Sequence, residues 1–326
     1  MSEATAHETD RKQALVQAAD AARFAPSIHN TQPWRWVVHP DRLELFGVAE
    51  RQLKEQDPDG HMLLVSCGTA LRYAQVALAA RNWDCEIDRP AGEPLAVLRA
   101  TGYRVADADD VRRADLLAKR HTDRRTAGDE PIAPDVLGDL VAATERGGAR
   151  LHLLRRDQVI DLAVAVEHAE KAQGSDERLQ RDMADWIGGD RPGGTGIPDA
   201  NLPQEQPATT VAERDFGASG TLEAGEGHDG AATYGVLYGA GDEPADWLCA
   251  GEALSALWLA AIGHGVTLLP VSSPAEVPFT RQELQRLLGG VGFPYLALRL
   301  GTAGPAGPEP AATPRLAGDQ VIEFAD

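Results

Sequence analysis

The side chains best suited to chemistry in this sequence form a basic cluster, Lys119-Arg120-His121-Thr122-Asp123-Arg124-Arg125. Guanidinium groups present forked N–H donors that match phosphate oxygens, and the nearby hydroxyl of Thr122 adds another donor. The cluster stands out because the chain carries a net charge of −19. A solvated basic turn that pairs with surrounding carboxylates would also explain it, so the residues alone leave both interpretations open.

A second segment, residues 25–34, reads Ala-Pro-Ser-Ile-His-Asn-Thr-Gln-Pro-Trp. It follows an amphipathic helical run and precedes an extended apolar segment. Pro26 disfavours continuation of the helix, and Ser27 and Asn30 are short polar side chains able to bond exposed backbone groups. Pro33 stiffens the turn into the strand. A helix end, a turn and a buried tryptophan are the simpler alternative.

Both segments resemble signatures of the nitroreductase-like flavoproteins, which bind FMN. Residues 25–34 match the pattern A-P-S-x-x-N-x-Q-P-W, and residues 120–124 are similar to the R-x-S-x-R element, with Thr122 in place of serine. The resemblance implies that residues 120–124 hold the phosphate and ribityl groups of FMN. The FMN-binding residues that it implies are Pro26, Ser27, Asn30, Gln32, Arg120, His121, Thr122, Arg124, Pro270, Val271, Ser272 and Arg315.

Four of these positions rest on weaker similarity. Pro270-Val271-Ser272 follows a long apolar helix, where the family places backbone N–H groups near the flavin ring. Such donors would favour electron density on the reduced ring. Arg315 matches a late basic residue that closes on the phosphate, and residues 196–198, Gly-Ile-Pro, resemble an element near the flavin.

The order of the two signatures departs from the family pattern. Ordinary members carry R-x-S-x-R first, whereas here it comes about a hundred residues after the other signature. Ordinary members are homodimers with two FMN sites at the interface. A fused pair that keeps one signature in each half would build one complete site. The chain therefore resembles the tandem, Acg-type subgroup, and the resemblance implies one FMN per chain in a monomer that mimics a homodimer.

The elements that must position these residues form a repeat. Residues 67–80 align without gaps with residues 250–263, and each segment is small and apolar on nearly all faces, as expected of a buried central helix. A strand-like segment follows each. Tight packing of small-residue helices would give the same likeness. We predict an α+β, three-layer, nitroreductase-like fold in two tandem copies, residues 1–110 and 111–326, that form a pseudo-dimer.

The composition changes between residues 188 and 230. Glycine, proline, acidic residues and threonine dominate there, and hydrophobic periodicity disappears. A structureless loop of this length is usually functional or disordered. We expect either a lid over the site or a tolerated surface insertion.

Bulk properties exclude several classes of partner. The charge of −19 argues against nucleic acids and anionic membranes. No apolar run is expected to approach the roughly 18–20 residues needed to span a bilayer, and the acidic N-terminus does not resemble a signal peptide. The three cysteines lack metal-ligand spacing, and no metal site is expected. These features predict a cytoplasmic protein, and the family resemblance implies a small-molecule electron acceptor as its partner.

The resemblance implies an FMN-dependent NAD(P)H oxidoreductase of nitroreductase type. NAD(P)H would pass a hydride to flavin N5 in a ping-pong cycle, and a nitro compound, quinone or similar acceptor would take the electrons. No side chain need act as a catalytic acid or base. One alternative is an FMN-binding storage or redox-sensing protein with a closed lid. A flavin-free interaction protein is a further alternative.

Overall fold

The computed structural model describes residues 3–188, 193–217, 220–225, 227–304 and 310–325, with the side chains of residues 3–6 left aside. The helices are α1 (Glu3–Ala22), α2 (His61–Ala79), α3 (Ala108–Leu116), α4 (Pro134–Arg146), α5 (Arg156–Gly174), α6 (Glu177–Ala184), α7 (Pro244–Gly263), α8 (Ser273–Glu276) and α9 (Pro278–Leu287). The strands are β1 (Trp34–Val38), β2 (Arg42–Gly47), β3 (Trp83–Asp88), β4 (Ala96–Tyr103), β5 (Arg150–Leu153), β6 (Thr233–Gly239), β7 (Val266–Val271), β8 (Phe293–Thr302) and β9 (Ile322–Phe324). Short 3₁₀ turns cover Ile28–Asn30, Ala49–Arg51, Asp199–Asn201 and Gly318–Gln320.

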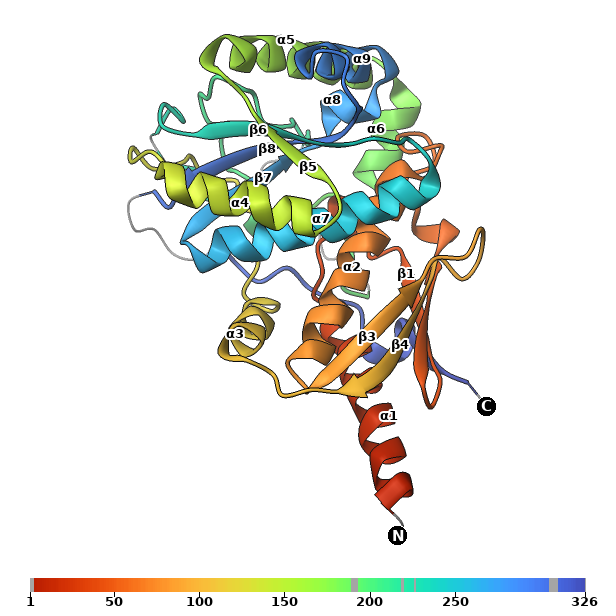
Figure 1. Ribbon diagram of the computed structural model, residues 1–326. Helices are drawn as coiled ribbons and strands as arrows, with labels where there is room; N and C mark the ends of the chain where they lie inside the picture. Colours follow the sequence, from red (N-terminus) through yellow and green to blue (C-terminus); the bar gives the residue numbers. More distant parts are fainter. Residues whose placement is uncertain (1–2, 189–192, 218–219, 226, 305–309, 326) are drawn as a thin grey trace.

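Two sheets of matching topology divide the protein. In the part that the structure describes, one sheet has the strand order β3-β4-β2-β1-β9 and the other has the order β7-β8-β6-β5. The first four strands of the two orders correspond, because β3 and β7 each follow a long central helix. Figure 1 shows the two sheets on opposite sides of α2 and α7. The predicted α+β fold with two tandem copies is confirmed.

Helices α2 and α7 cross at two glycines that occupy the same position in the aligned repeat. A Cβ atom added to Gly68 would lie 1.9 Å from the carbonyl oxygen of Leu248, and one added to Gly251 would lie 1.9 Å from that of Val65. Each glycine thus lies against the carbonyl group of the residue three positions before the glycine of the other helix. The crossing is therefore close to symmetric, and only residues without a side chain fit it.

The halves exchange parts of their cores. Leu248 and Leu259 of α7 belong to the apolar cluster of the first half, whereas Met62 and Val65 of α2 belong to that of the second. At the C-terminus, β9 pairs in parallel with β1 of the first sheet. The division near residue 110 is our proposal; α3 spans this position, and β9 returns to the first sheet.

Helices α2 and α7 also bear on the expectation that no apolar segment reaches membrane-spanning length. Both are long and apolar enough by length and composition, with a mean hydropathy of 1.3, so that expectation is wrong. However, 78% of the apolar window of α2 and 61% of that of α7 are buried within the protein. Their place at the centre of the fold (Figure 1) identifies them as core helices.

Candidate functional site

Three arginines from distant parts of the chain line one small cavity. Arg120 and Arg124 lie between α3 and α4, and Arg315 lies in the C-terminal segment. The cavity encloses about 360 Å³, including space open to solvent, and is also lined by Ser27 and Thr122. The structure thus brings together residues that the two signatures supply from opposite halves.

This positive charge has few counter-charges nearby. Arg120 is buried with its guanidinium carbon 4.6 Å from the ring centroid of Trp258, and its Nε and Nη1 atoms have no hydrogen-bond partner among the described residues. Burial, with the nearby charge of Arg120, lowers the pKa of Arg315 to about 9. Burial also lowers the pKa of Arg124 to about 10. Guanidinium groups stay protonated at neutral pH. The lowered pKa values therefore indicate that keeping Arg124 and Arg315 charged at this place is unfavourable, and a bound anion would offset that cost.

The segment after α1 is held in an unusual backbone conformation. His29, Asn30 and Gln32 have φ values of 43°, 55° and 48°, a left-handed region that residues other than glycine seldom adopt. The Ser27 hydroxyl accepts a hydrogen bond from the Gln32 N–H at 2.9 Å. Strained backbone of this kind persists where the surrounding structure fixes it, often at binding sites.

Two residues of α2 fix the same segment to the central helices. The Ser66 hydroxyl accepts from the Ile28 N–H at 3.1 Å, and Thr69 Oγ1 donates to the Pro26 carbonyl at 2.5 Å. Because Ser66 and Thr69 are buried, these bonds form away from competing water. They place Pro26 and Ser27 on the wall of the small arginine-lined cavity and of a larger cavity next to it, described below.

Asn30 and Gln32 bond to the protein rather than projecting freely into the cavity. Asn30 Oδ1 accepts from Arg315 Nη1 at 3.1 Å, and Asn30 Nδ2 donates to the Gly196 carbonyl at 3.0 Å. Gln32 is fully buried and bonds to the Gly194 carbonyl and to the Leu316 N–H. Asn30 therefore orients Arg315, while Gln32 ties the segment to the C-terminal tail.

A larger cavity adjoins the arginines and encloses about 870 Å³, including open solvent. Its walls are mainly apolar, with Leu254 and Trp258 from α7 and Leu269 from β7. Pro270, Val271 and Ser272 line it at the end of β7. An apolar cavity continuous with a cationic pocket suits a flat ring that carries a phosphate tail.

His29 also lines this cavity. Burial, with a further contribution from Arg214, lowers the pKa of His29 to about 3, so the ring is neutral at pH 7. Neutral imidazole can hydrogen-bond but carries no charge toward a substrate.

The segment between α6 and β6 supplies the remaining wall, with Glu213, Arg214 and Phe216. The Phe216 ring lies edge-on to His29, with centroids 5.8 Å apart, and its centroid lies 5.6 Å from the guanidinium carbon of Arg124. Phe216 therefore contacts residues from both halves. We call Glu213, Arg214 and Phe216 the cover, because they are the described residues of this segment that line the cavity; residues 189–192, 218–219 and 226 of the predicted lid lie outside the described residues.

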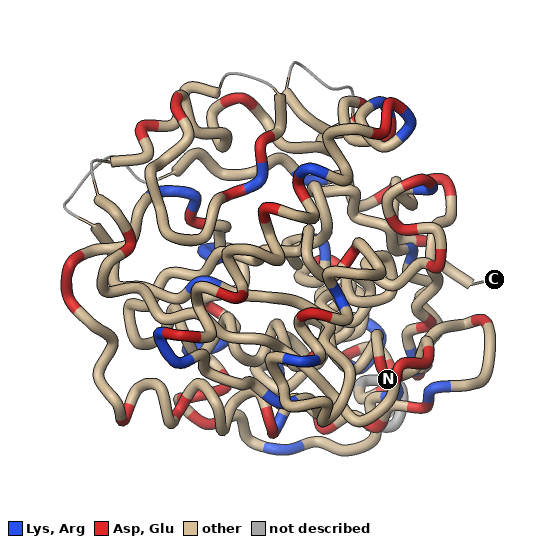
Figure 2. The backbone as a smooth tube through the Cα atoms, turned by 90° about the horizontal axis from the view of Figure 1, so that it is seen from above, with Lys and Arg blue, Asp and Glu red and all other residues tan. Residues whose placement is uncertain are grey.

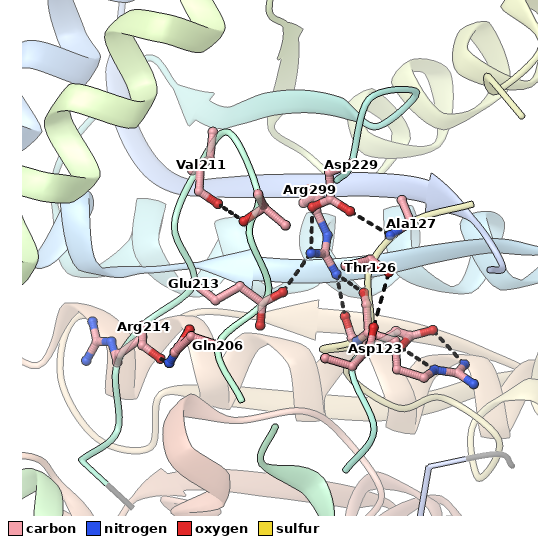
Figure 3. Close-up of polar contacts among 12 residues, drawn as sticks. Asp123, Thr126, Ala127, Gln206, Val211, Glu213, Arg214, Asp229 and Arg299 are labelled. Atoms are coloured by element: carbon pink, nitrogen blue, oxygen red, sulfur yellow. Dashed lines mark hydrogen bonds and ion pairs between the residues drawn. The ribbon is translucent and has the colours of Figure 1, made fainter. Parts of the chain in front are cut away.

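Two adjacent buried ion pairs fix this cover. Arg299 of β8 donates to Glu213 Oε1 at 2.6 Å and to Asp229 Oδ2 at 2.8 Å. Arg214 donates to Glu276 Oε2 of α8 at 2.6 Å. Figure 3 shows the Glu213 side chain turned toward Arg299 and that of Arg214 turned away from it. Because both pairs are buried, removing one partner would leave an uncompensated charge.

Of the remaining predicted residues, His121 lines neither cavity. Its Nδ1 lies 3.2 Å from the Lys119 carbonyl oxygen. Conversely, Thr69, Glu213, Arg214, Phe216 and Trp258 line the larger cavity but were not predicted from the sequence. Thr69 and Trp258 lie in the aligned repeat, where the other copy has Glu252 and Gln75, and this difference between the copies is a signal that could have marked them.

The repeat also identifies the residues at the second place between the halves that is equivalent to the cavity. Continuing the gapless alignment pairs Ser272 with Arg89, and it pairs Thr69 with Glu252. Arg89 Nη2 donates to Glu252 Oε2 at 2.5 Å, and Gln75 Nε2 donates to Glu252 Oε1 at 2.6 Å. The counterparts of cavity-lining residues are therefore bonded to one another.

Comparison with known proteins agrees with this geometry. No family model matches the chain. The Mycobacterium tuberculosis protein "Putative NAD(P)H nitroreductase Rv3131" is 35% identical over 313 residues, which cover 92% of this chain and 88% of the relative. A second relative from that organism, "Putative NAD(P)H nitroreductase acg", is 29% identical over 316 residues, which cover 94% and 95%.

Among solved structures, the FMN and NADPH-dependent nitroreductase NfnB from Sphigopyxis sp. strain HMH aligns with a TM-score of 0.39 and 15% identity, over 66% of this chain and 99% of that one. The sequence relationship to the first relative is much stronger and extends over nearly the full length of both chains. The chain belongs to the nitroreductase-like family.

Proposed function

We propose that the protein is an FMN-dependent NAD(P)H oxidoreductase of nitroreductase type that acts on a small-molecule acceptor. The observation that carries the proposal is a group of three arginines, the buried Arg120 and the half-buried Arg124 and Arg315, beside an apolar cavity between the halves. Relatives named as NAD(P)H nitroreductases support the same activity.

The residues present fit FMN. Arg120 has buried guanidinium nitrogens without a partner in the described part of the chain, and a phosphate would supply their acceptors. Arg124 and Arg315 would share this phosphate with Arg120. Thr122 and Ser27 would bond to the ribityl chain. Pro270, Val271 and Ser272 would face the ring.

When bound, FMN would supply the redox chemistry, taking a hydride from NAD(P)H and passing the electrons to a nitro compound, a quinone or a similar acceptor. The residues of this chain would bind and orient. Asn30 holds Arg315 in place, and the neutral His29 adds no charge to the cavity. The apolar walls exclude water from the reacting centre, so the proposal needs no side chain as acid or base.

Storage or sensing of FMN is the second candidate, and the fixed cover favours it. Glu213 and Arg214 hold the cover through buried ion pairs, and Phe216 lies against His29 and Arg124. A cover held in this way would limit access by NAD(P)H.

Anaerobic titration of the FMN-loaded protein distinguishes the two candidates. An oxidoreductase loses its flavin absorbance within seconds of adding NADPH or NADH, and the absorbance returns with a quinone. A storage protein keeps its absorbance with both nucleotides and loses it with dithionite. The latter result would contradict the oxidoreductase proposal while leaving FMN binding intact.

A further inference from the structure

A second cleft opens beside the cofactor cavity and has no part in the proposed function. It lies between residues 55–62 of the first half and helices α5 to α9 of the second, and it encloses about 1450 Å³, including open solvent. Met62 lines both this cleft and the cofactor cavity. The cleft is therefore a neighbour of the cofactor site with its own walls.

The charge on the cleft walls is predominantly negative. The acidic residues that line it are Glu55, Asp57, Asp59, Asp176, Asp242 and Glu276. The basic residue among its lining is Arg281, which is bonded to Asp242. Glu276 is paired with Arg214, and the exposed Arg178 lies 3.6 Å from Asp176 and 3.9 Å from Glu55. Carboxylates still outnumber the cations, so the cleft disfavours anionic ligands.

A buried side chain of the cleft leaves a polar atom unpaired. Gln56 is 6% exposed, but its amide nitrogen donates to Glu276 Oε2 at 2.6 Å and its amide oxygen accepts from His29. His61 is 7% exposed and its Nε2 has no partner in the described part of the chain. Burial, with the charge of Arg281, lowers the pKa of His61 to about 4, so its ring is neutral at pH 7. Unpaired buried polar atoms are unusual and point to a missing partner.

An aromatic wall completes the cleft. The rings of His61 and Trp247 lie 5.0 Å apart, and Trp247 Nε1 donates to Asp242 at 2.8 Å, which fixes the indole. An indole face attracts organic cations. Across the described residues no three His, Cys, Asp or Glu side chains are grouped so as to hold a metal ion, so the chemistry favours an organic cation over a metal.

We propose that this cleft binds a linear polyamine. Its ammonium groups would meet the carboxylates at the rim and the unpaired His61 Nε2 inside, and its methylene chain would lie along Trp247. Acidic residues come from separate elements around the cleft, which suits a ligand that carries several separated charges. This proposal does not rest on the oxidoreductase activity.

Calorimetric titration of the FMN-loaded protein with spermidine tests the proposal. We expect one spermidine per chain, with no binding of an uncharged diol of similar length. The double variant Glu55→Gln, Asp59→Asn removes two exposed rim charges and should weaken binding about tenfold. Trp247→Leu should weaken it about fivefold. Circular dichroism and FMN content show whether each variant is folded.

The control is the double variant Asp135→Asn, Glu145→Gln, which removes two exposed charges on α4, outside the cleft. It should change affinity less than twofold. Absence of spermidine binding would overturn the proposal. Equal weakening by both double variants would also overturn it, because that result indicates general attraction to an acidic protein. Displacement of spermidine by Mg²⁺ at matched ionic strength would instead assign the cleft to a metal ion, and it too would overturn the proposal.

Discussion

At the scale of single residues, the site depends on arginines whose burial is unfavourable without an anion. Arg120 is buried against Trp258 with two nitrogens unpaired among the described residues. Each charge-assisted contact to phosphate contributes about 1.5–3 kcal/mol. We therefore expect Arg120→Ala and Arg124→Ala each to weaken FMN binding roughly 10- to 150-fold, as measured by flavin fluorescence on titrating the apoprotein.

The matched control is Arg146→Ala on α4, an exposed arginine outside both cavities. It should leave FMN affinity unchanged. If neither Arg120→Ala nor Arg124→Ala lowers the affinity, the phosphate does not lie among these arginines.

Glu213 predicts a specific dependence on pH. Burial raises its pKa from 4.5 to about 7, although Arg299 opposes the shift; two carboxylates, Glu213 and Asp229, share that one guanidinium. Between about pH 4.5 and 7 the folded protein thus binds more protons than the unfolded chain, and the free energy of unfolding falls as pH rises.

Glu213→Gln cannot titrate and isolates this effect. The unfolding free energy of the wild type minus that of the variant should fall from pH 5 to 7.5, by at most about 1.4 kcal/mol per pH unit. Urea unfolding of both proteins at several pH values measures it. A difference that stays constant over this range would contradict the raised pKa, because it would show that Glu213 is ionised throughout.

The residues of the site differ in how far the sequence could predict them. Ser27, Thr122 and Arg124 belong to signatures of fixed spacing, so a single sequence identified them, and they line one cavity in the structure. Arg214 and Phe216 lie in a segment without periodicity. Their partners, Glu276 and His29, are far away along the chain, and one sequence contains no information on such contacts.

At the scale of elements, the crossing of α2 and α7 is the contact that holds the halves together. An added methyl group on Gly68 or Gly251 would overlap the backbone of the other helix. We expect Gly251→Ala to lower the free energy of unfolding by at least about 3 kcal/mol, as measured by urea unfolding.

Gly138 provides the control within a helix. It lies in α4, and an added Cβ would meet nothing within 4 Å. Gly138→Ala should therefore stabilise the protein by about 0.5–1 kcal/mol. Similar effects of the two substitutions would contradict the close crossing.

The repeat of small residues predicted both central helices, because helices buried on most faces need apolar residues throughout. The sequence did not predict β9. This strand covers three residues, Ile322–Phe324, which is too short for a periodic signal. Its pairing with β1 is fixed by the fold of the whole chain.

At the scale of the whole molecule, an acidic protein gathers three arginines at one internal cavity. Figure 2 shows acidic positions spread along the outer loops of the chain, with basic positions interspersed. The net charge of −19 opposes binding of free anions to the surface. Capture of an anionic cofactor therefore depends on the local arginines rather than on the overall field.

The two halves are not equivalent, and this difference sets the expected stoichiometry. In the repeat, Arg89 corresponds to Ser272 and Glu252 to Thr69, and Ser272 and Thr69 line the cofactor cavity. At the equivalent place, Arg89 and Glu252 instead form an ion pair with each other. We infer that one chain binds one FMN and that a single chain supplies both walls of the site. Light scattering should give the mass of one chain for the FMN-loaded protein.

The visible spectrum of the purified protein, combined with flavin and protein quantitation, tests the central claim most directly. The predicted result is a yellow protein with visible flavin absorbance and one FMN per chain. A colourless protein that takes up no added FMN would contradict the claim that these arginines form a flavin site. Two FMN per chain would contradict the claim that only one of the two equivalent places between the halves retains a flavin site.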